Sequence, residues 1–558
     1  MLRPLLIGLT LLCMMHASTG RAESPATLVV HDEVLHTIDP RLFGQFLERA
    51  SFGEPGPEAF VDRDTGRLPA RVREMLHAMD VPVVRFPGGS DVDYIDWRDM
   101  IDNVPGRDGP RPVTTGFSGQ SITNHFGYDE YFALRDEMGW QTILVVNLLD
   151  ALAKKRPLDE AAQLAAGLVA YANAPQDATL PETMPDWPAV RAANGHAEPF
   201  GIQYVQIGNE MWLGRVRDAV RDATGLDGEE LGHWYREVYT AYIRAIRAVD
   251  PDLPIIIDQW SAPGQWRIVL EDPYIREHVQ YVAHHKYAPG PSNQLSRDGE
   301  PLAPDALSDE QWWWAWATMP GAYDDAGQNI AFGPELDSAT ALGYAIAATE
   351  WNWNGWRWRE AGTTFDAPAA AGIGAAGWVH GMMRQGAQIR MANQSTLLGI
   401  GWPIAAIHGD REGDGEPYHN PQGAATTFYR HRHGPNRLRT ELSGVLMQPQ
   451  PHRVGWGPPI EHAAVLDVLA TADDDTIYIH AINRSFADDH ELAINLSGVG
   501  GVANTAVHHT FTCNLQAEPG HGVAKGMVQV REQVIPFASR TSITLPRRSA
   551  SIVVIDRD

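Results

Sequence analysis

The chain has 558 residues, enough for roughly two to four domains, although a single closed barrel can exceed about 250 residues. Its 44 Lys and Arg against 70 Asp and Glu give a formal charge of -26, a field that repels nucleic acid and anionic membrane surfaces. We therefore expect neither as a partner. A neutral, hydroxyl-rich ligand is compatible with this charge.

The N-terminus has the pattern of a secretory signal peptide. A basic start, Met1-Leu2-Arg3, precedes an apolar stretch and the small-residue sequence Gly20-Arg21-Ala22. The pattern predicts a signal peptide over residues 1–22 and a secreted or periplasmic protein; an ordinary first helix is the alternative. Cys513 is then the one remaining cysteine, so no internal disulfide forms and stability must come from core burial.

Strand and helix patterns alternate through the middle of the chain. Apolar runs predict eight strands, at 43–47, 81–86, 142–146, 204–207, 255–257, 281–283, 345–349 and 388–391. Helical spacing lies between most of them, at 68–79, 128–138, 159–172, 230–249 and 369–384. Eight alternating units imply a parallel sheet closed into a (β/α)8 TIM barrel, here residues 41–400.

The pattern changes after residue 400. Short alternating segments without intervening helices predict a β-sandwich over residues 401–558, with strands at 465–469, 476–483, 491–496, 506–512, 526–530 and 549–555. Residues 23–40 precede the barrel and include a strand-like segment at 26–37. We expect this segment to join the C-terminal sandwich.

Two glutamates follow strands that lie far apart in the chain. Glu210 comes after the fourth predicted strand and Glu350 after the seventh. The loops at the carboxyl ends of barrel strands carry the chemistry of this fold, so both side chains are expected on its functional face. Cleavage of a glycosidic bond needs one carboxyl that arrives protonated and one that arrives ionised. The pair therefore predicts a glycoside hydrolase.

Other polar residues at the strand ends fit this chemistry. Asn209 can donate to a sugar hydroxyl next to the anomeric carbon, and Arg85 or Tyr287 can keep a carboxylate ionised. The competing interpretations are a tight turn at Pro87-Gly88-Gly89 and a tryptophan-rich packing layer around Glu350.

No cofactor or metal is predicted. His284 and His285 lack a spaced acidic partner, so His285 is expected to orient a carboxylate or a sugar. The chain has no Gly-x-Ser-x-Gly element for acyl transfer and no glycine-rich phosphate loop.

Taken together, these motifs resemble glycoside hydrolase family 51, the α-L-arabinofuranosidases. The resemblance keeps the order of the motifs over most of the chain: 43–48, 85–89, 124–130, 191–196, 208–210, 285–287 and 350–352. It implies a barrel with a sandwich, a furanose contact for Glu48, an acid/base role for Glu210 and a nucleophile role for Glu350. Double displacement requires the two carboxyl groups to lie about 5 to 5.5 Å apart.

Two positions depart from the family pattern. Ser90 stands where the family usually has a substrate-binding asparagine, and Thr396 where it usually has a glutamine. Apart from these two positions, the resemblance implies a retaining α-L-arabinofuranosidase acting on arabinose-containing polysaccharides or oligosaccharides. An endo-glucanase, another furanosidase or a xylosidase on the same scaffold is the alternative, and a non-catalytic carbohydrate-binding protein is a third. The sequence leaves a homo-oligomer open.

Overall fold

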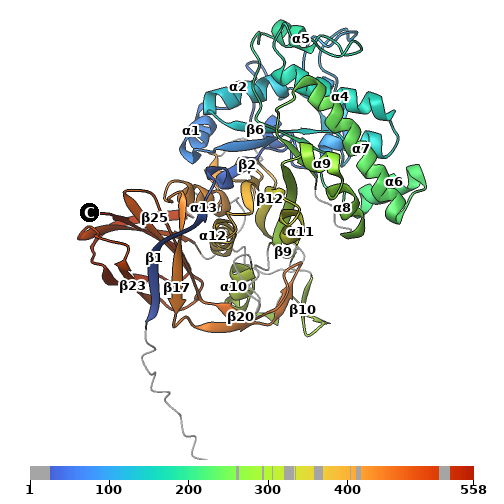
Figure 1. Cartoon of the computed structure of the whole chain (residues 1–558). Helices are drawn as coiled ribbons and strands as arrows, with labels where there is room; N and C mark the ends of the chain where they lie inside the picture. The colour runs from blue at the N-terminus through green and yellow to red at the C-terminus, as the bar shows by residue number, and fades with distance from the viewer. Residues whose placement is uncertain are drawn as a thin grey trace, which may run out of the picture.

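A computed structural model describes residues 25–258, 263–291, 294–303, 306–319, 332, 335–356, 368–402, 404–409, 416–514 and 528–558. The predicted signal peptide lies outside these residues. Within them, no helix is long and apolar enough to cross a membrane. Figure 1 shows a barrel built from the first two thirds of the chain and, beside it, a strand-rich region built mainly from the last third.

Eight parallel strands close the barrel, which confirms the predicted fold class. In chain order they are β2 (Gly44–Phe46), β3 (Val83–Phe86), β6 (Gln141–Val146), β7 (Tyr204–Ile207), β8 (Ile255–Ile257), β9 (Tyr281–Pro291), β12 (Ala345–Trp356) and β13 (Ile389–Ser395). Seven of them each contribute a residue to one small apolar cluster, Val83, Ile143, Tyr204, Ile256, Ala283, Ala347 and Met391. Side chains therefore fill the interior of the barrel, as the fold requires.

Helices follow the strands and cover the outside of the barrel. They are α1 (Ala70–Met79), α2 (Tyr128–Met138), α4 (Leu158–Asn173), α7 (Gly228–Val249), α8 (Pro263–Leu270), α9 (Pro273–His278), α11 (Glu335–Thr340), α12 (Pro368–Arg384) and α13 (Pro421–Arg430). The long α7 shows why these segments are helical: Asp227 caps its first turn, and its tyrosines and isoleucines recur on one buried face.

Shorter elements fill the connections. They are η1 (Pro40–Phe43), η2 (Gly56–Ala59), η3 (Ser90–Tyr94), η4 (Trp97–Met100), β4 (Thr114–Thr115), β5 (Ser121–Ile122), α3 (Leu149–Leu152), α5 (Trp187–Ala193), α6 (Gly214–Thr224), β10 (Leu295–Arg297), β11 (Glu300–Pro301), α10 (Asp309–Thr318), β14 (Leu398–Gly399), β15 (Ile407–His408), β16 (Tyr418–His419), β18 (Met447–Gln450), β19 (His452–Val454) and β20 (Ile460–Ala464). The helix α10 lies between β9 and β12 in the chain.

The C-terminal region is one nine-stranded sheet. It contains β1 (Ala26–Thr37), β17 (Asn436–Ser443), β21 (Leu466–Ala472), β22 (Thr476–Asn483), β23 (His490–Gly498), β24 (Thr505–Cys513), β25 (Val528–Pro536), β26 (Arg540–Leu545) and β27 (Ser549–Asp556). Strand β1 lies between β17 and β23, so the N-terminal segment is built into this sheet (Figure 1). Residues from both ends of the strand order share one buried core, because the sheet folds over on itself as a sandwich. The division of the chain at residue 400 stays a prediction.

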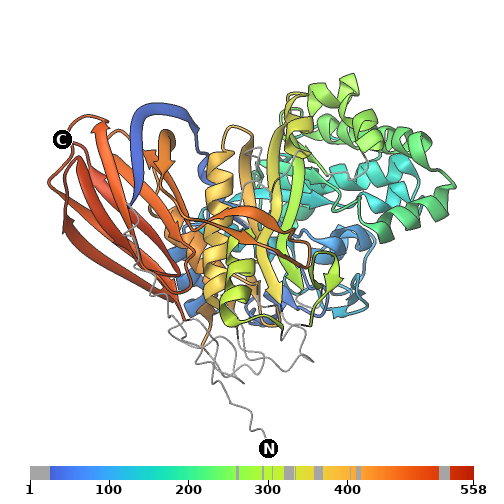
Figure 2. The ribbon, with the colours of Figure 1, turned by 90° about the horizontal axis from the view of Figure 1, so that it is seen from below.

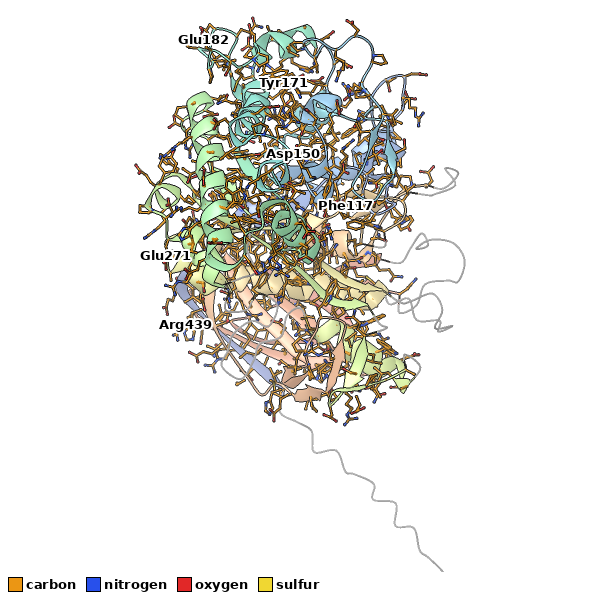
Figure 3. All side chains as sticks on the ribbon, turned by 90° about the vertical axis from the view of Figure 1, so that its right-hand side faces the viewer. Phe117, Asp150, Tyr171, Glu182, Glu271 and Arg439 are labelled. Carbon is orange, nitrogen blue, oxygen red and sulfur yellow. The ribbon has the colours of Figure 1, made fainter. Side chains whose placement is uncertain are left out.

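Helix α12 joins the two parts. It stands between the sandwich and the barrel strands (Figures 1 and 2). A Cβ atom on its Gly372 would come within 2.9 Å of Cys513 Sγ, so the helix and β24 approach closely. Asp467 of β21 accepts hydrogen bonds from Arg384 and His380 of α12 and is also paired with Arg484. Figure 3 shows Glu182 at the top of the barrel and Arg439 on the edge of the strand-rich region below it.

Candidate active site

Glu210 and Glu350 meet at the carboxyl ends of the barrel strands. Glu210 lies three residues beyond β7, whereas Glu350 lies within β12, which continues to Trp356 rather than ending at residue 349. The pairing of β12 with β9 shifts register between Ala347 and Glu350, a bulge that re-aims the glutamate. An oxygen of each glutamate and a ring nitrogen of His285 all lie within 4.8 Å of one another.

Arg85, at the third position of β3, connects this pair to β7. Its Nη1 donates to Glu350 Oε1 at 2.7 Å, its Nη2 to Asn209 Oδ1 at 2.6 Å and its Nε to Gln206 Oε1 at 2.9 Å. The guanidinium is fully buried and lies over the ring of Phe46. The planar fork of arginine thus fixes three side chains at once, a task that lysine cannot perform.

Glu350 is held as an anion. Burial by itself would raise the pKa of its carboxyl, but His285, Arg85 and the hydroxyl of Tyr287 together lower it below the ordinary value. The Tyr287 hydroxyl donates to Glu350 Oε2 at 2.8 Å. Both oxygens of Glu350 therefore accept a hydrogen bond, and one comes from a cation.

Glu210 is more accessible than Glu350, with 16% of its side chain exposed against 8%. His285 Nδ1 lies 3.1 Å from Glu210 Oε1, and His285 Nε2 lies 2.9 Å from the hydroxyl of Thr349. Burial would lower the pKa of His285, but Glu350 and Glu210 outweigh it and raise that pKa. A protonated His285 donates to Glu210 from Nδ1 and to Thr349 from Nε2.

These three groups also form a set of potential metal ligands. Two carboxylates and a histidine can bind a divalent cation. In this site, however, Arg85 and Tyr287 already hydrogen-bond to the two oxygens of Glu350, and a metal ion would have to displace a buried guanidinium. The donor set fits an ionised carboxylate balanced by Arg85 better than a metal centre.

Glu48 lies beside Glu210 and Glu350, and its pKa is shifted in the opposite direction from that of Glu350. Burial, followed by the negative charge of Glu350, raises the pKa of Glu48 well above its ordinary value. A Cβ atom at position 89 would come within 1.8 Å of Glu48 Oε1, so only glycine fits there at its positive φ of 71°. The raised pKa favours the protonated form of Glu48, which can donate a hydrogen bond.

Ser90 and Thr396 contact neither glutamate within the described part of the chain. Arg215 donates from Nη2 to Ser90 Oγ at 2.7 Å, while its guanidinium lies over the ring of Phe117. The hydroxyl of Thr396 donates to the carbonyl of Phe46 at 3.1 Å, and the side chain is buried. Whether either residue contacts sugar stays a prediction.

Sequence reasoning missed several residues that shape the site. Gln206 accepts from Arg85 in the middle of an otherwise apolar strand. Asp93 and Asp258 accept hydrogen bonds from the backbone on either side of Glu210. A glutamine inside a buried strand and an aspartate directly after three isoleucines are signals that could have pointed to Gln206 and Asp258.

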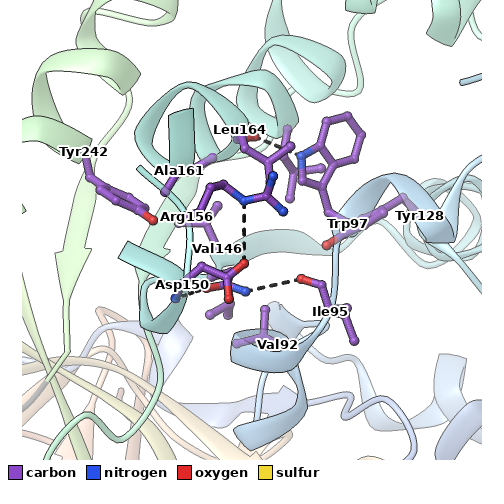
Figure 4. A pocket seen from close by; sticks show the side chains of 14 residues that line it. Val92, Ile95, Trp97, Tyr128, Val146, Asp150, Arg156, Ala161, Leu164 and Tyr242 are labelled. Carbon is purple, nitrogen blue, oxygen red and sulfur yellow. Dashed lines mark hydrogen bonds and ion pairs between the residues drawn. The ribbon is translucent and has the colours of Figure 1, made fainter. Parts of the chain in front are cut away.

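A separate small cavity lies between β6 and α4. Its volume is about 20 Å³, roughly enough for one water molecule. Neither Glu210 nor Glu350 lines it; the residues labelled in Figure 4, among them Trp97, Asp150 and Arg156, surround it. Asp150 and Arg156 form an ion pair of 3.7 Å there. This cavity is not the place where the two glutamates act.

Comparison with known proteins shows which enzymes the chain resembles. Residues 75–297 match the family model described as the alpha-L-arabinofuranosidase 1 domain. An intracellular exo-α-(1→5)-L-arabinofuranosidase of Bifidobacterium longum is 24% identical over 94% of this chain and 88% of its own length. The chain is similar in sequence to α-L-arabinofuranosidases and in fold to solved structures of glycoside hydrolase family 51. These similarities confirm the prediction of a glycoside hydrolase.

Two further similarities point to the same kind of enzyme. An intracellular exo-α-(1→5)-L-arabinofuranosidase of Streptomyces lividans is 30% identical, but the match covers 45% of this chain and 35% of that protein. The crystal structure of the α-L-arabinofuranosidase of Thermotoga maritima in complex with arabinose has a TM-score of 0.70 with 20% identity, covering 95% of this chain and all of that one. The latter similarity supports the fold.

The relatives correct the prediction of location. Those from Bifidobacterium longum, Streptomyces lividans and Bacillus subtilis are named intracellular enzymes, which contradicts a secreted or periplasmic protein. The prediction depended on a basic start and an apolar run within residues 1–22, which lie outside the described residues. Such a pattern is short and generic, so it does not by itself establish export.

Proposed function

We propose that this chain is a retaining α-L-arabinofuranosidase of glycoside hydrolase family 51 that acts on arabinose-containing polysaccharides or oligosaccharides. The observation that carries the proposal is the pair of carboxylate oxygens, one from Glu210 and one from Glu350, within 4.8 Å of each other. Retaining glycosidases hold their two carboxyl groups about 5 to 5.5 Å apart, whereas inverting ones leave about 6.5 to 9.5 Å for a water molecule. The sugar preference is supported by the names of the relatives.

In this mechanism Glu350 is the nucleophile. Arg85 and Tyr287 keep it ionised, so it can attack the anomeric carbon and form a covalent glycosyl-enzyme. As the bond to carbon forms, negative charge leaves the carboxylate. Both donors are already in place, so no reorganisation is needed during the step.

Glu210 is the acid/base. It protonates the departing oxygen in the first step and removes a proton from the attacking water in the second. Its greater exposure suits a group that must contact first a leaving group and then water. His285, at 3.1 Å, orients its carboxyl.

Two neighbours are proposed to bind the sugar. The amide nitrogen of Asn209 is buried and has no hydrogen-bond partner within the described residues, while Arg85 fixes the oxygen of the same amide. That nitrogen is free to donate to a sugar hydroxyl, a contact that strengthens in the transition state. Glu48, whose pKa is raised, can supply a second donor nearby in its protonated form.

Covalent trapping tests the mechanism. A fluorinated or epoxide-type arabinofuranoside is incubated with the enzyme, and the labelled peptide is identified by mass spectrometry. Glu350 should carry the label, and a Glu350→Gln variant should remain unlabelled under the same conditions. Labelling of a different carboxylate would remove Glu350 from its proposed role.

A panel of nitrophenyl glycosides tests the sugar preference. The α-L-arabinofuranoside should be hydrolysed with the highest kcat/KM, ahead of other furanosides, of xylopyranosides and of glucan substrates. Faster hydrolysis of a glucan backbone would favour an endo-glucanase. Unchanged activity in Glu350→Ala would instead indicate a carbohydrate-binding protein with a contaminating activity.

A further inference from the structure

Two buried aspartates flank the segment that carries Glu210. Asp93, in η3 after β3, accepts from the backbone N–H of Asn209 at 3.1 Å through Oδ2. Its Oδ1 accepts from Leu148 at 2.7 Å and from Leu149 at 3.1 Å. Asp258, directly after β8, accepts from the N–H of Met211 at 2.6 Å through Oδ2. The residues before and after Glu210 are thus each held by a carboxylate from a different strand unit.

Neither aspartate has an arginine or lysine partner within 4.0 Å in the described ranges, and each is about 1% exposed. Burial raises the pKa of Asp93 to about 7 and that of Asp258 to about 6. A buried carboxyl without an ion-pair partner is costly for a fold, although the charge of His285 lowers the pKa of Asp258 and offsets part of that cost. The backbone N–H groups that donate to the two carboxyls offset part of this cost and tie each aspartate to the segment that carries Glu210.

The segment between them has an unusual backbone. Glu210 has a φ of +52°, in the left-handed region, although it carries a side chain, and Gly208 before it has a φ of +82°. Such a conformation persists in a non-glycine residue only where the surroundings over-determine it. The hydrogen bonds from Asn209 and Met211 to the two aspartates supply that constraint.

We propose that Asp93 and Asp258 are positioning residues that hold Asn209–Met211 so that the carboxyl of Glu210 faces the leaving oxygen. They touch neither the sugar nor the reacting atoms, and they act through the backbone of the acid/base segment. The inference rests on the acid/base role proposed for Glu210. It goes beyond that role because it assigns the orientation of the Glu210 carboxyl to two residues outside the glutamate pair.

Dependence on the leaving group separates this role from a purely structural one. The 2,4-dinitrophenolate ion is a weak base, so it departs with little help from an acid. The phenolate ion is a stronger base, and its departure needs the proton of Glu210. The readout is the ratio of kcat/KM for phenyl to that for 2,4-dinitrophenyl α-L-arabinofuranoside. Loss of folded protein lowers both values equally and leaves the ratio unchanged.

Substitution by asparagine should have different effects at the two aspartates. Asp93 uses both oxygens, so Asp93→Asn cannot keep both sets of bonds, and the ratio should fall by about tenfold. Asp258 uses one oxygen for Met211, so Asp258→Asn can keep that bond and should leave the ratio within about twofold of the wild type. Asp258→Ala should lower it by about tenfold.

Two reference variants complete the experiment. Glu210→Ala should lower the ratio by about 10² or more, the size expected for loss of general acid catalysis. Asp467→Asn alters another buried carboxylate, between the sandwich and α12, and should leave the ratio unchanged. If Asp258→Ala does not fold, the two asparagine variants still make the test.

The outcomes distinguish the inference from the proposed function. A normal ratio in Asp93→Asn and in Asp258→Ala, beside a lowered ratio in Glu210→Ala, would overturn the positioning role and leave the acid/base role standing. An unchanged ratio in Glu210→Ala would overturn the acid/base role itself. Equal falls in Asp258→Asn and Asp258→Ala would also contradict the inference, because the retained oxygen should rescue the variant.

Discussion

The hydroxyl of Tyr287 should set the acid limb of the pH–activity profile. Tyr287→Phe keeps the ring and removes one hydrogen bond of 2.8 Å to Glu350 Oε2. A hydrogen bond to a charged group contributes about 1.5 to 3 kcal/mol, and 1.36 kcal/mol corresponds to one pKa unit. Arg85 and His285 remain in the variant. We therefore expect the lower end of this range, a rise of about one unit in the pKa of Glu350.

The sign follows from the direction of the wild-type pKa. The pKa of Glu350 is lowered below its ordinary value, so the ionised nucleophile persists at pH values where a free glutamate is protonated. In Tyr287→Phe the acid limb of kcat/KM should move up by about one pH unit, because that limb reports groups in the free enzyme. Activity at the optimum should fall less than activity at acid pH.

The assay is the pH dependence of kcat/KM with a nitrophenyl arabinofuranoside. Tyr131→Phe is a matched control, since it is another buried tyrosine, but its hydroxyl lies 2.9 Å from Thr142 Oγ1 instead of a carboxylate. Its acid limb should match that of the wild type. An unmoved acid limb in Tyr287→Phe, with the protein folded, would refute the account of how Glu350 is kept ionised.

Three further outcomes are expected. Arg85→Lys should lower kcat by about 10²-fold, since an ammonium cannot bond to Glu350, Asn209 and Gln206 together; a kcat within about threefold of the wild type, measured on folded protein, would contradict this. The pKa of Glu48 is raised in the folded state, so above the ordinary value of about 4.5 the carboxyl ionises more readily in the unfolded chain. The free energy of unfolding therefore falls as the pH rises from about 4.5 toward the folded pKa. Glu48→Gln avoids that cost, and its thermal unfolding midpoint should exceed that of the wild type by more at pH 8 than at pH 4; a constant difference would show that Glu48 is ionised in the fold. Prolonged treatment with EDTA should leave kcat unchanged, because Arg85 already holds the anion that a metal ion would bind; loss of activity that zinc or manganese restores would show the opposite.

Much of the barrel could be predicted because its signals are local. The strand Tyr204–Ile207 is recognisable from four consecutive residues, all of them buried, and the helix Gly228–Val249 from the recurrence of apolar side chains on one face. Alternation of such segments then implies closure, and closure places Glu210 and Glu350 on one face. The bulge in β12 was not predicted, because it depends on the pairing of β12 with β9.

The sequence by itself determined the barrel, the two glutamates and the residue types around them. The tertiary structure decided their chemical states. Burial and neighbouring charges, which set each pKa, come from residues far apart in the chain: Arg85 and Glu350 are 265 positions apart, and Glu48 is affected by both Glu350 and Glu210. The strained backbone of Glu210, held from Asp93 and Asp258, is likewise visible only after folding. Apolar periodicity can be recognised in the sequence itself, whereas desolvation and charge coupling arise only between elements that packing has brought together.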